Sequence, residues 1–335
     1  MGFDINEISK NSKGGTELMR EGLEQRLDPA LIEDFQIIPS RVRELENDKI
    51  RVLWLHDLPG DPESDHLKNG GHEKFHQLVF VSNWQMQRYI EYYGIPWSKC
   101  VVIENAITPT PRQSIKKSDD VFKIIYHTTP HRGLEILVPV FEKLAEKHTN
   151  IELDVYSSFK IYGWDQRDEQ FKQLFDRCRN HPKINYHGTV SNEEVRKAVA
   201  EAHMFAYPSI WVETSCISLM EAMSSECLCI HPNYGALYET SGGTTMMYQM
   251  QDKLHDHAQA LYNHMDSAIE LATGQARDED LVRNIKGLQK GYVDLRYNWD
   301  KVTNLWVHLL QILKAKYPTS ESRKDQGPLF HYKVS

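Results

Sequence analysis

The sequence has few of the features that would take it out of the ordinary globular class. No apolar run reaches the roughly 20 residues that span a bilayer. Its five cysteines form no C-x-x-C pair, so we expect reduced, structural thiols. Basic residues are outnumbered by acidic ones, 39 to 47, so the net charge is −8. This disfavours binding to nucleic acid through bulk electrostatics, although peripheral contact with a membrane through a local basic patch stays open.

Several catalytic motifs are missing as well. The sequence has no Walker-type loop, no G-x-S-x-G elbow and no H-E-x-x-H pair, which argues against an ATPase, a serine hydrolase or a zinc protease. His255, His257 and His264 lie close together without metal-ligand spacing, so we expect them on a helix surface. The residues at 278–280 match an Asp-x-Asp metal-binding motif, but they lie in a charged stretch with a helical pattern. We therefore expect them on the solvent-exposed face of a helix, without a metal ion.

The N-terminus lacks the basic start and apolar stretch of a signal peptide, which predicts a cytoplasmic location. What remains is a chain of 335 residues with 40% hydrophobic and 26% charged residues, long enough for two domains. Apolar strands alternate with amphipathic helices on both sides of a polar break at 108–120. Near-continuous apolar strands between helices indicate parallel sheets covered on both faces. The sequence therefore predicts two α/β domains.

The stretch 207–221, YPSIWVETSCISLME, is the most informative part of the chain. Residues 202–206 resemble a buried strand, 207–213 a loop and 216–224 a helix, so Glu213 lies in the loop and Glu221 about two turns into the helix. The first backbone N–H groups of a helix favour a phosphate. Here those groups belong to Thr214, Ser215, Cys216 and Ile217. Carboxylates on both sides can accept hydrogen bonds from sugar hydroxyls, although two glutamates at this spacing can also be solvated helix-end charges.

The flanking residues decide between these interpretations. Glu213-x7-Glu221 is followed by Ala222-Met223, by Cys229-Ile230 and by a turn at 235–239. This pattern resembles the signature of the family-4 glycosyltransferases, retaining enzymes of the GT-B fold. The resemblance implies two Rossmann-like domains with parallel sheets that face each other across a cleft, here with a reduced N-terminal domain. It also implies transfer of a sugar from a nucleoside-diphosphate sugar to an acceptor hydroxyl, without a metal or other cofactor.

The resemblance sets the expected domain boundaries. We expect an acceptor-side domain at 1–109, a linker at 110–120 and a nucleotide-sugar-binding domain at 121–296. A helix at 297–315 would cross back to the first domain, and a polar, loose tail would follow at 316–335. Gly14 and Gly15, at a helix start, resemble the family's glycine loop over the donor phosphates, although a plain turn is the alternative. Only thirteen residues precede that pair, so the usual first strand is expected to be short or absent.

Arg132 follows a strand and precedes a helix, a place suited to binding phosphate. The family usually carries an arginine and, five residues later, Lys-Gly. Arg132-Gly133 matches the second element, whereas His127 stands where the first arginine is expected. A neutral His127 would remove one permanent charge from the leaving-group pocket. As alternatives, Arg132 would be a surface residue and His127 a satisfied histidine at a strand end.

Two further strand ends complete the predicted site. His56 follows a first-domain strand and resembles a family histidine near the sugar hydroxyls, although the sequence leaves open whether His56 or Asp57 faces the ligand. Thr189 and Val190 follow a second-domain strand where the family's nucleotide base rests. The predicted catalytic residues are thus Glu213, Arg132 and His56. The predicted donor-binding residues are Gly14, Gly15, His127, Arg132, Thr189, Val190, Thr214, Ser215, Cys216, Ile217 and Glu221.

The acceptor stays unknown at this stage: a glycan, a lipid-linked molecule or a small molecule. Two other functions also stay open. A non-catalytic nucleotide-sugar-binding protein with the same fold would explain His127 and the short N-terminus, and a GT-B epimerase would change the donor's sugar without an acceptor.

Overall fold

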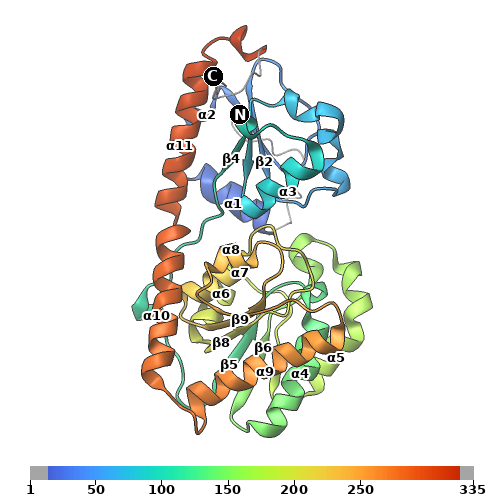
Figure 1. Ribbon diagram of the computed structural model, residues 1–335, viewed down its shortest axis with the longest axis vertical. Coiled ribbons are helices and arrows are strands. Elements are labelled where there is room, and N and C mark those ends of the chain that lie inside the picture. The colour runs from blue at the N-terminus through green and yellow to red at the C-terminus, as the bar shows by residue number, and fades with distance from the viewer. Residues whose placement is uncertain (1–13, 325–335) are drawn as a thin grey trace. The chain divides into compact units, whose positions relative to one another are not determined.

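The computed structural model describes residues 14–324, and the chain divides into two compact units (Figure 1). Unit 1 consists of Met1–Ala106 and Trp299–Ser335, and unit 2 of Ile107–Asn298. The chain therefore returns to unit 1 two residues after the predicted start of the returning helix. The expected shortening of a first strand concerns residues 1–13, which lie outside the described residues.

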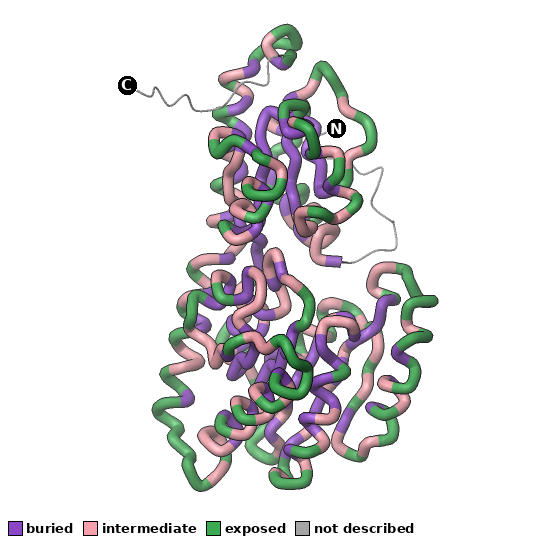
Figure 2. Tube along the Cα trace, turned by 45° about the vertical axis from the view of Figure 1, so that its right-hand side comes forward, coloured by how far each residue is buried: buried purple, intermediate pink, exposed green. Residues whose placement is uncertain are grey.

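Unit 1 is built around a parallel sheet with the strand order β1-β2-β3-β4. Its strands are β1 (Phe35–Pro39), β2 (Ile50–Leu55), β3 (Gln77–Phe80) and β4 (Cys100–Val102). Its helices are α1 (Gly15–Glu24), α2 (Pro29–Ile32), α3 (Asn83–Tyr93) and α11 (Trp299–Lys316). The first three strands are buried along their whole length, as expected for a sheet covered on both faces (Figure 2).

The returning helix α11 belongs to the core of unit 1. The indole of Trp306 packs edge-on against Trp54 of β2, with ring centroids 5.0 Å apart. Beyond the helix, Tyr317 is buried, and the guanidinium of Arg323 donates to the Asp48 carbonyl over 2.9 Å and pairs with Asp34 over 3.0 Å. The prediction of a loose tail is therefore wrong for residues 317–324, because one buried arginine and one aromatic ring anchor them.

Unit 2 contains a parallel sheet with the strand order β10-β9-β8-β5-β6-β7. Its strands are β5 (Phe122–Tyr126), β6 (Ile151–Val155), β7 (Ile184–Tyr186), β8 (Met204–Ala206), β9 (Leu228–Pro232) and β10 (Met246–Tyr248). Its helices are α4 (Leu134–Lys147), α5 (Lys172–Asn180), α6 (Asn192–Glu201), α7 (Ile217–Ser224), α8 (Leu237–Ser241), α9 (Leu254–Thr273) and α10 (Glu279–Arg296). Two parallel sheets confirm the predicted α/β class.

The strand order of unit 2 changes direction in the middle of the sheet. From β5 the chain adds β6 and β7 on one side, and then returns to add β8, β9 and β10 on the other. The change of direction lies between β5 and β8, which are hydrogen-bonded neighbours. Open α/β sheets bind ligands at such a point, outside the carboxyl ends of the strands. The topology of unit 2 therefore marks one place for a site before any side chain is considered.

A capping box begins α6, because Ser191 and Glu194 bond each other's backbone N–H groups. The expectation that His257 lies on a helix surface is wrong, because this residue is buried and its Nε2 lies 3.3 Å from the Pro208 carbonyl. A carbonyl can only accept, so the imidazole donates to the loop after β8.

All five cysteines are free thiols, and four of them are buried. Within residues 14–324, no helix combines the length and the apolar character that crossing a membrane requires.

Burial of His231 on β9 makes the stability of the protein depend on pH. Its Nδ1 lies 2.9 Å from the Pro232 carbonyl and its Nε2 lies 2.7 Å from the Thr245 hydroxyl. Burial lowers the pKa of His231 from 6.5 to about 4. At pH values between the two pKa values, His231 therefore binds a proton in the unfolded chain but not in the folded chain. The stabilisation that comes from keeping His231 neutral is complete above the pKa of the unfolded chain. It is lost as the pH falls toward about 4.

We predict that His231→Gln flattens this pH dependence. The free energy of unfolding of the wild type should fall more steeply between about pH 7 and pH 4.5 than that of the variant, by up to roughly 3 kcal/mol for a shift of this size. Urea unfolding at both pH values measures the difference. His255→Gln, at an exposed position on α9, is the matched control and should keep the wild-type slope. Equal slopes for the wild type and His231→Gln would contradict the prediction.

Candidate active site

Two loops meet at the point where the strand order of unit 2 changes direction. The first follows β5 and contains His127 and Arg132, and the second follows β8 and contains Tyr207 and Glu213. Both loops leave the carboxyl ends of neighbouring parallel strands, so the fold itself brings the predicted arginine and glutamate together.

The centre of the site is a buried ion pair. The guanidinium of Arg132, on a short 3-10 turn (Pro130–Arg132), donates through Nη1 to Oε1 of Glu213, and the phenol of Tyr207 donates to the same oxygen. Glu213 is only 4% exposed. Burial alone would lower the pKa of Arg132, but the carboxylate of Glu213 raises it well above its usual range. Arg132 is therefore a permanent cation whose other N–H groups can serve a ligand.

Close backbone contacts hold the two loops in place. A Cβ on Gly133, where φ is +118°, would lie 2.2 Å from the carbonyl oxygen of Pro208. A Cβ on Gly235, where φ is +60°, would lie 2.6 Å from the backbone nitrogen of Glu213. The neighbouring Ala236 N–H donates to the Glu213 carbonyl over 2.7 Å. Only glycine fits both positions, and the turn after β9 thereby fixes the backbone of Glu213.

Six buried side-chain polar atoms around the loops have no hydrogen-bond partner among residues 14–324. Each follows the carboxyl end of β5, β6 or β8, and the atoms are His127 Nε2, Thr129 Oγ1, His131 Nδ1, Arg132 Nε, Ser157 Oγ and Ser215 Oγ. An unpaired buried polar group costs about 1–3 kcal/mol, so such groups are rarely left without a partner. Their concentration at one edge of one sheet indicates a site that takes a polar ligand.

The start of α7 borders the ion pair. Cys216 is the N-cap residue, and its side chain makes no capping hydrogen bond. Of the predicted phosphate-binding amides, that of Ile217 belongs to the first turn of α7, whereas Thr214 and Ser215 precede the N-cap residue. Glu221, further along α7, accepts from Nε of Arg196 on α6 over 3.3 Å, and burial raises the pKa of its carboxyl.

His127 is neutral at the pH of the cell. The residue is 8% exposed, its ring packs against Phe205 with centroids 5.0 Å apart, and burial lowers its pKa to about 4. The hydroxyl of Ser218 donates to its backbone carbonyl rather than to its ring. The site therefore has a neutral imidazole where the family resemblance implies a second guanidinium.

The other predicted residues belong to another loop of unit 2 or to unit 1. Thr189 and Val190 follow β7, which is separated from β5 by β6. Gly14, Gly15 and His56 belong to unit 1, where Gly14 is the N-cap of α1 and His56 follows β2. Burial lowers the pKa of His56 to about 3, so this imidazole is neutral as well. A role of these five residues in donor binding or catalysis stays a prediction.

Tyr207 is the functional residue that sequence reasoning missed. It ends the apolar run of β8 and is fully buried, so its pattern is that of a core residue. The signal that could have identified it is a phenol at a strand end, six residues before the predicted glutamate. A buried Tyr hydroxyl needs a hydrogen-bond partner, and Glu213 is the nearest acidic residue in sequence.

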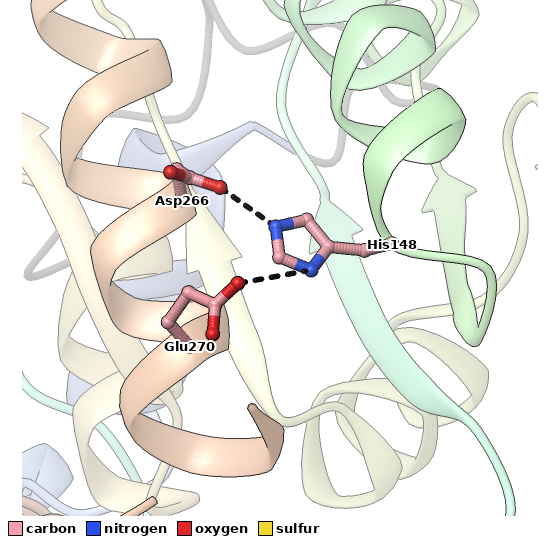
Figure 3. Close-up of side chains that lie close together, drawn as sticks. All are labelled: His148, Asp266 and Glu270. Atoms are coloured by element: carbon pink, nitrogen blue, oxygen red, sulfur yellow. Dashed lines mark hydrogen bonds and ion pairs between the residues drawn. The ribbon is translucent and has the colours of Figure 1, made fainter. Parts of the chain in front are cut away.

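One side-chain cluster away from this site has the composition of a metal centre. The potential ligand atoms of His148, Asp266 and Glu270 lie within 4.8 Å of one another (Figure 3). His148 caps the C-terminus of α4 and precedes β6, so it lies at the amino end of the strands, opposite the site. The ammonium of Lys147 lies 2.7 and 2.9 Å from the two Asp266 oxygens. Lys147 also lies 3.4 Å from Glu270, so both carboxylates are already paired and the cluster is an ion-pair network between α4 and α9.

Comparisons with known proteins agree with this geometry. Residues 109–242, which include both site loops, match the family model of the glycosyl transferases group 1. The GPI3 subunit of phosphatidylinositol N-acetylglucosaminyltransferase from Saccharomyces cerevisiae is 24% identical over 212 residues. That alignment covers 60% of this chain and 44% of the relative, so the chain matches less than half of the curated protein.

Solved structures show the fold. A glycosyltransferase from Rickettsia africae has a TM-score of 0.65 at 18% identity, over 92% of this chain and 84% of the other. HepE from Anabaena, solved in complex with UDP and glucose, has a TM-score of 0.62 at 14% identity, over 88% of this chain and 81% of the other. The chain thus has the GT-B fold, and the match to the glycosyl transferases group 1 model lies within its second unit.

Proposed function

We propose that the protein is a retaining glycosyltransferase that moves a sugar from a nucleoside-diphosphate sugar to an acceptor hydroxyl without a metal ion. The observation that carries this proposal is the buried cluster of Arg132, Glu213 and Tyr207 among six unpartnered polar atoms at the carboxyl ends of β5, β6 and β8. The UDP and glucose in the Anabaena HepE complex support this class of donor.

Arg132 and the first amides of α7 would bind the diphosphate. When the sugar leaves, negative charge develops on the departing nucleoside diphosphate, and preorganised donors around it contribute most in such a step. Arg132 offers N–H groups beside the one that Glu213 occupies, among them the buried Nε. The helix start adds backbone donors and the positive end of the helix dipole. These two sources of positive potential replace the charge that the neutral His127 does not supply.

Glu213 would orient the donor sugar rather than act as a base or nucleophile. Its Oε1 accepts from a guanidinium and a phenol at once, so this oxygen is already engaged. A carboxylate held in this way is a poor nucleophile and can still accept from sugar hydroxyls. The departing phosphate itself would then take the proton from the acceptor hydroxyl on the same face of the sugar, which retains its configuration. Glu221, farther along α7, would accept from the ribose hydroxyls.

The pairing of the carboxylates supports chemistry without a metal. A divalent cation in a transferase needs carboxylate oxygens that are free to coordinate it. At this site Glu213 is engaged by Arg132 and Tyr207, and Glu221 by Arg196. Positive charge for the leaving group would instead come from the chain itself.

A non-catalytic nucleotide-sugar-binding protein is the second candidate. The neutral His127 favours it, because the site has one guanidinium where the resemblance implies two positive groups. Such a protein would bind the donor and leave it unchanged.

We predict that Arg132→Ala and Glu213→Ala each lower turnover by roughly 100-fold or more, the usual effect of removing a group that stabilises developing charge. Purified protein is incubated with UDP-, GDP- and ADP-sugars, and release of the nucleoside diphosphate is measured. Breaking a buried pair also costs about 3–5 kcal/mol of stability, so Arg132→Lys and Glu213→Gln are measured in parallel, with thermal unfolding as the check on folding. Both should stay folded and lose most of the activity.

Arg177 and Glu142 supply the matched controls, because they form a more exposed ion pair in unit 2 between α5 and α4. Arg177→Ala and Glu142→Ala should keep wild-type turnover. Full activity in folded Arg132 and Glu213 variants would remove the proposed roles. Binding without turnover would instead establish the non-catalytic candidate, and conversion of the donor sugar without an acceptor would indicate an epimerase.

We also predict that Gly235→Ala weakens donor binding through the backbone of Glu213. The new Cβ would lie 2.6 Å from the Glu213 nitrogen, so the loop must move. Gly243→Ala is the control, because Gly243 has a similar φ of +69° and nothing within 4 Å of its Cβ position. Both variants should lose about 1 kcal/mol for the left-handed backbone. Only Gly235→Ala should raise the Kd of the donor in calorimetric titrations. The same Kd for both would show that the turn does not position Glu213.

A further inference from the structure

One helix of unit 2 has large apolar side chains on its outer face. On α10, Leu281 is 45% exposed, Leu288 is 60% exposed and Leu295 is 78% exposed. The three leucines are spaced seven residues apart, so they form one line along the helix. Single exposed leucines are ordinary, but three in one line form a continuous apolar surface. We call Leu281, Leu288 and Leu295 the leucine stripe.

The inner face of α10 is already packed, so the stripe cannot turn inward. Val282 and Val293 are buried in the core of unit 2. The buried ammonium of Lys290 donates to the Ser224 carbonyl over 2.8 Å and to the Thr110 carbonyl over 2.6 Å. The helix lies along one side of unit 2 (Figure 1). It therefore has apolar side chains on two faces, a pattern typical of a helix that is covered on both.

The backbone of α10 is open between the leucines. Gly291 lies three residues after Leu288 and four before Leu295, which places it on the same face. A Cβ added to Gly287 or Gly291 would meet no atom of the described residues within 4 Å. Glycine destabilises the interior of a helix relative to alanine, and no contact within unit 2 requires it at these positions. A second helix that packs closely against α10 would use this space.

The pattern along α10 is symmetric about Leu288. Leu281 and Leu295 lie seven residues before and after it, so a reversed copy of the helix presents the same stripe. Asn284 lies four residues before Leu288, and Gly291 lies three after it. In a reversed pair, the larger side chain of Asn284 would therefore face the glycine of the other copy. An interface between two copies related by a two-fold axis needs such a self-complementary surface.

Charges beside the stripe favour an antiparallel pair. Arg283 and Asp294 lie eleven residues apart, or about three helical turns, and thus on the same flank of the stripe. In an antiparallel pair centred on Leu288, Arg283 of each copy comes opposite Asp294 of the other. A parallel pair would instead bring two acidic helix starts together, at 278–280, and align the two helix dipoles. Exposed ion pairs contribute little affinity, so the charges select the direction and the leucines supply the contact area.

We propose that the leucine stripe is the interface of a homodimer, in which α10 packs antiparallel against α10 of a second copy of this chain. Leu288 then packs against Leu288 of the second copy, and Leu281 packs against Leu295 of the second copy. This inference goes beyond the proposed transfer reaction and does not depend on it.

The oligomeric state of the full chain tests the interface. Light scattering after size-exclusion chromatography should give the wild type twice the mass of one chain. Leu288→Glu should weaken the dimer by about tenfold or more, because each dimer loses two buried leucines and gains two carboxylates at its centre. Leu288 is exposed in the single chain, so the variant should keep the wild-type melting temperature.

Leu254→Glu is the matched control, because Leu254 is 63% exposed at the start of α9 and has no part in the stripe. It should stay as dimeric as the wild type.

Cysteine cross-linking tests the direction of the helices. Leu288→Cys should form an intermolecular disulfide with copper-phenanthroline as the oxidant, because the two thiols face each other across the two-fold axis. Leu281→Cys and Leu295→Cys should cross-link when mixed. Neither should cross-link alone, because identical positions would lie about 21 Å apart along the helix axis. The wild type, in which four of the five cysteines are buried, measures the background.

Three results would each overturn the proposal. They are a wild type that stays monomeric at its highest soluble concentration, a folded Leu288→Glu variant that stays as dimeric as the wild type, and cross-linking of Leu281→Cys with itself.

Discussion

The ion pair between Arg132 and Glu213 is the interaction on which the rest of the site depends. The buried carboxylate of Glu213 is tolerated only with a partner, and the half-buried guanidinium of Arg132 supplies it. The pair joins the loops after β5 and β8, the two strands between which the sheet of unit 2 changes direction. The conformations of Gly133 and Gly235, and the hydrogen bond from His257 to Pro208, can all be understood as means of holding that pair.

The electrostatics of the site follow from this arrangement. Burial keeps His127 neutral and Arg196 pairs with Glu221, so among the loops after β5 and β8 the permanent positive charge is that of Arg132. In the ligand-free protein that charge is balanced by Glu213. A diphosphate would have to share the guanidinium with the carboxylate, and the buried Nε of Arg132 shows that donors remain for it. In the proposed function, the amides at the start of α7 would take the place of a second arginine.

The sequence predicts the fold well because its signals are local. Alternating apolar strands and amphipathic helices identify the sheets, and the spacing of Glu213 and Glu221 with their flanks identifies the loop-to-helix junction. Tyr207 was missed because a buried tyrosine at a strand end has the pattern of a core residue, and only its distance to Glu213 reveals its role. His257 and the segment 317–324 were predicted to be exposed because polar residues usually lie at the surface of a protein. Each instead makes specific contacts with distant backbone. The six unpartnered atoms come from three loops, and no linear pattern brings these together.

The most direct test of the central claim is a crystal structure of the protein with a nucleoside diphosphate bound, using whichever of UDP, GDP or ADP raises the melting temperature most. The account predicts that the diphosphate oxygens lie about 3 Å from nitrogen atoms of Arg132 and from the first backbone amides of α7. It also predicts that Glu213 keeps its contact with Arg132. A diphosphate bound elsewhere on the chain, with these groups untouched, would contradict the account.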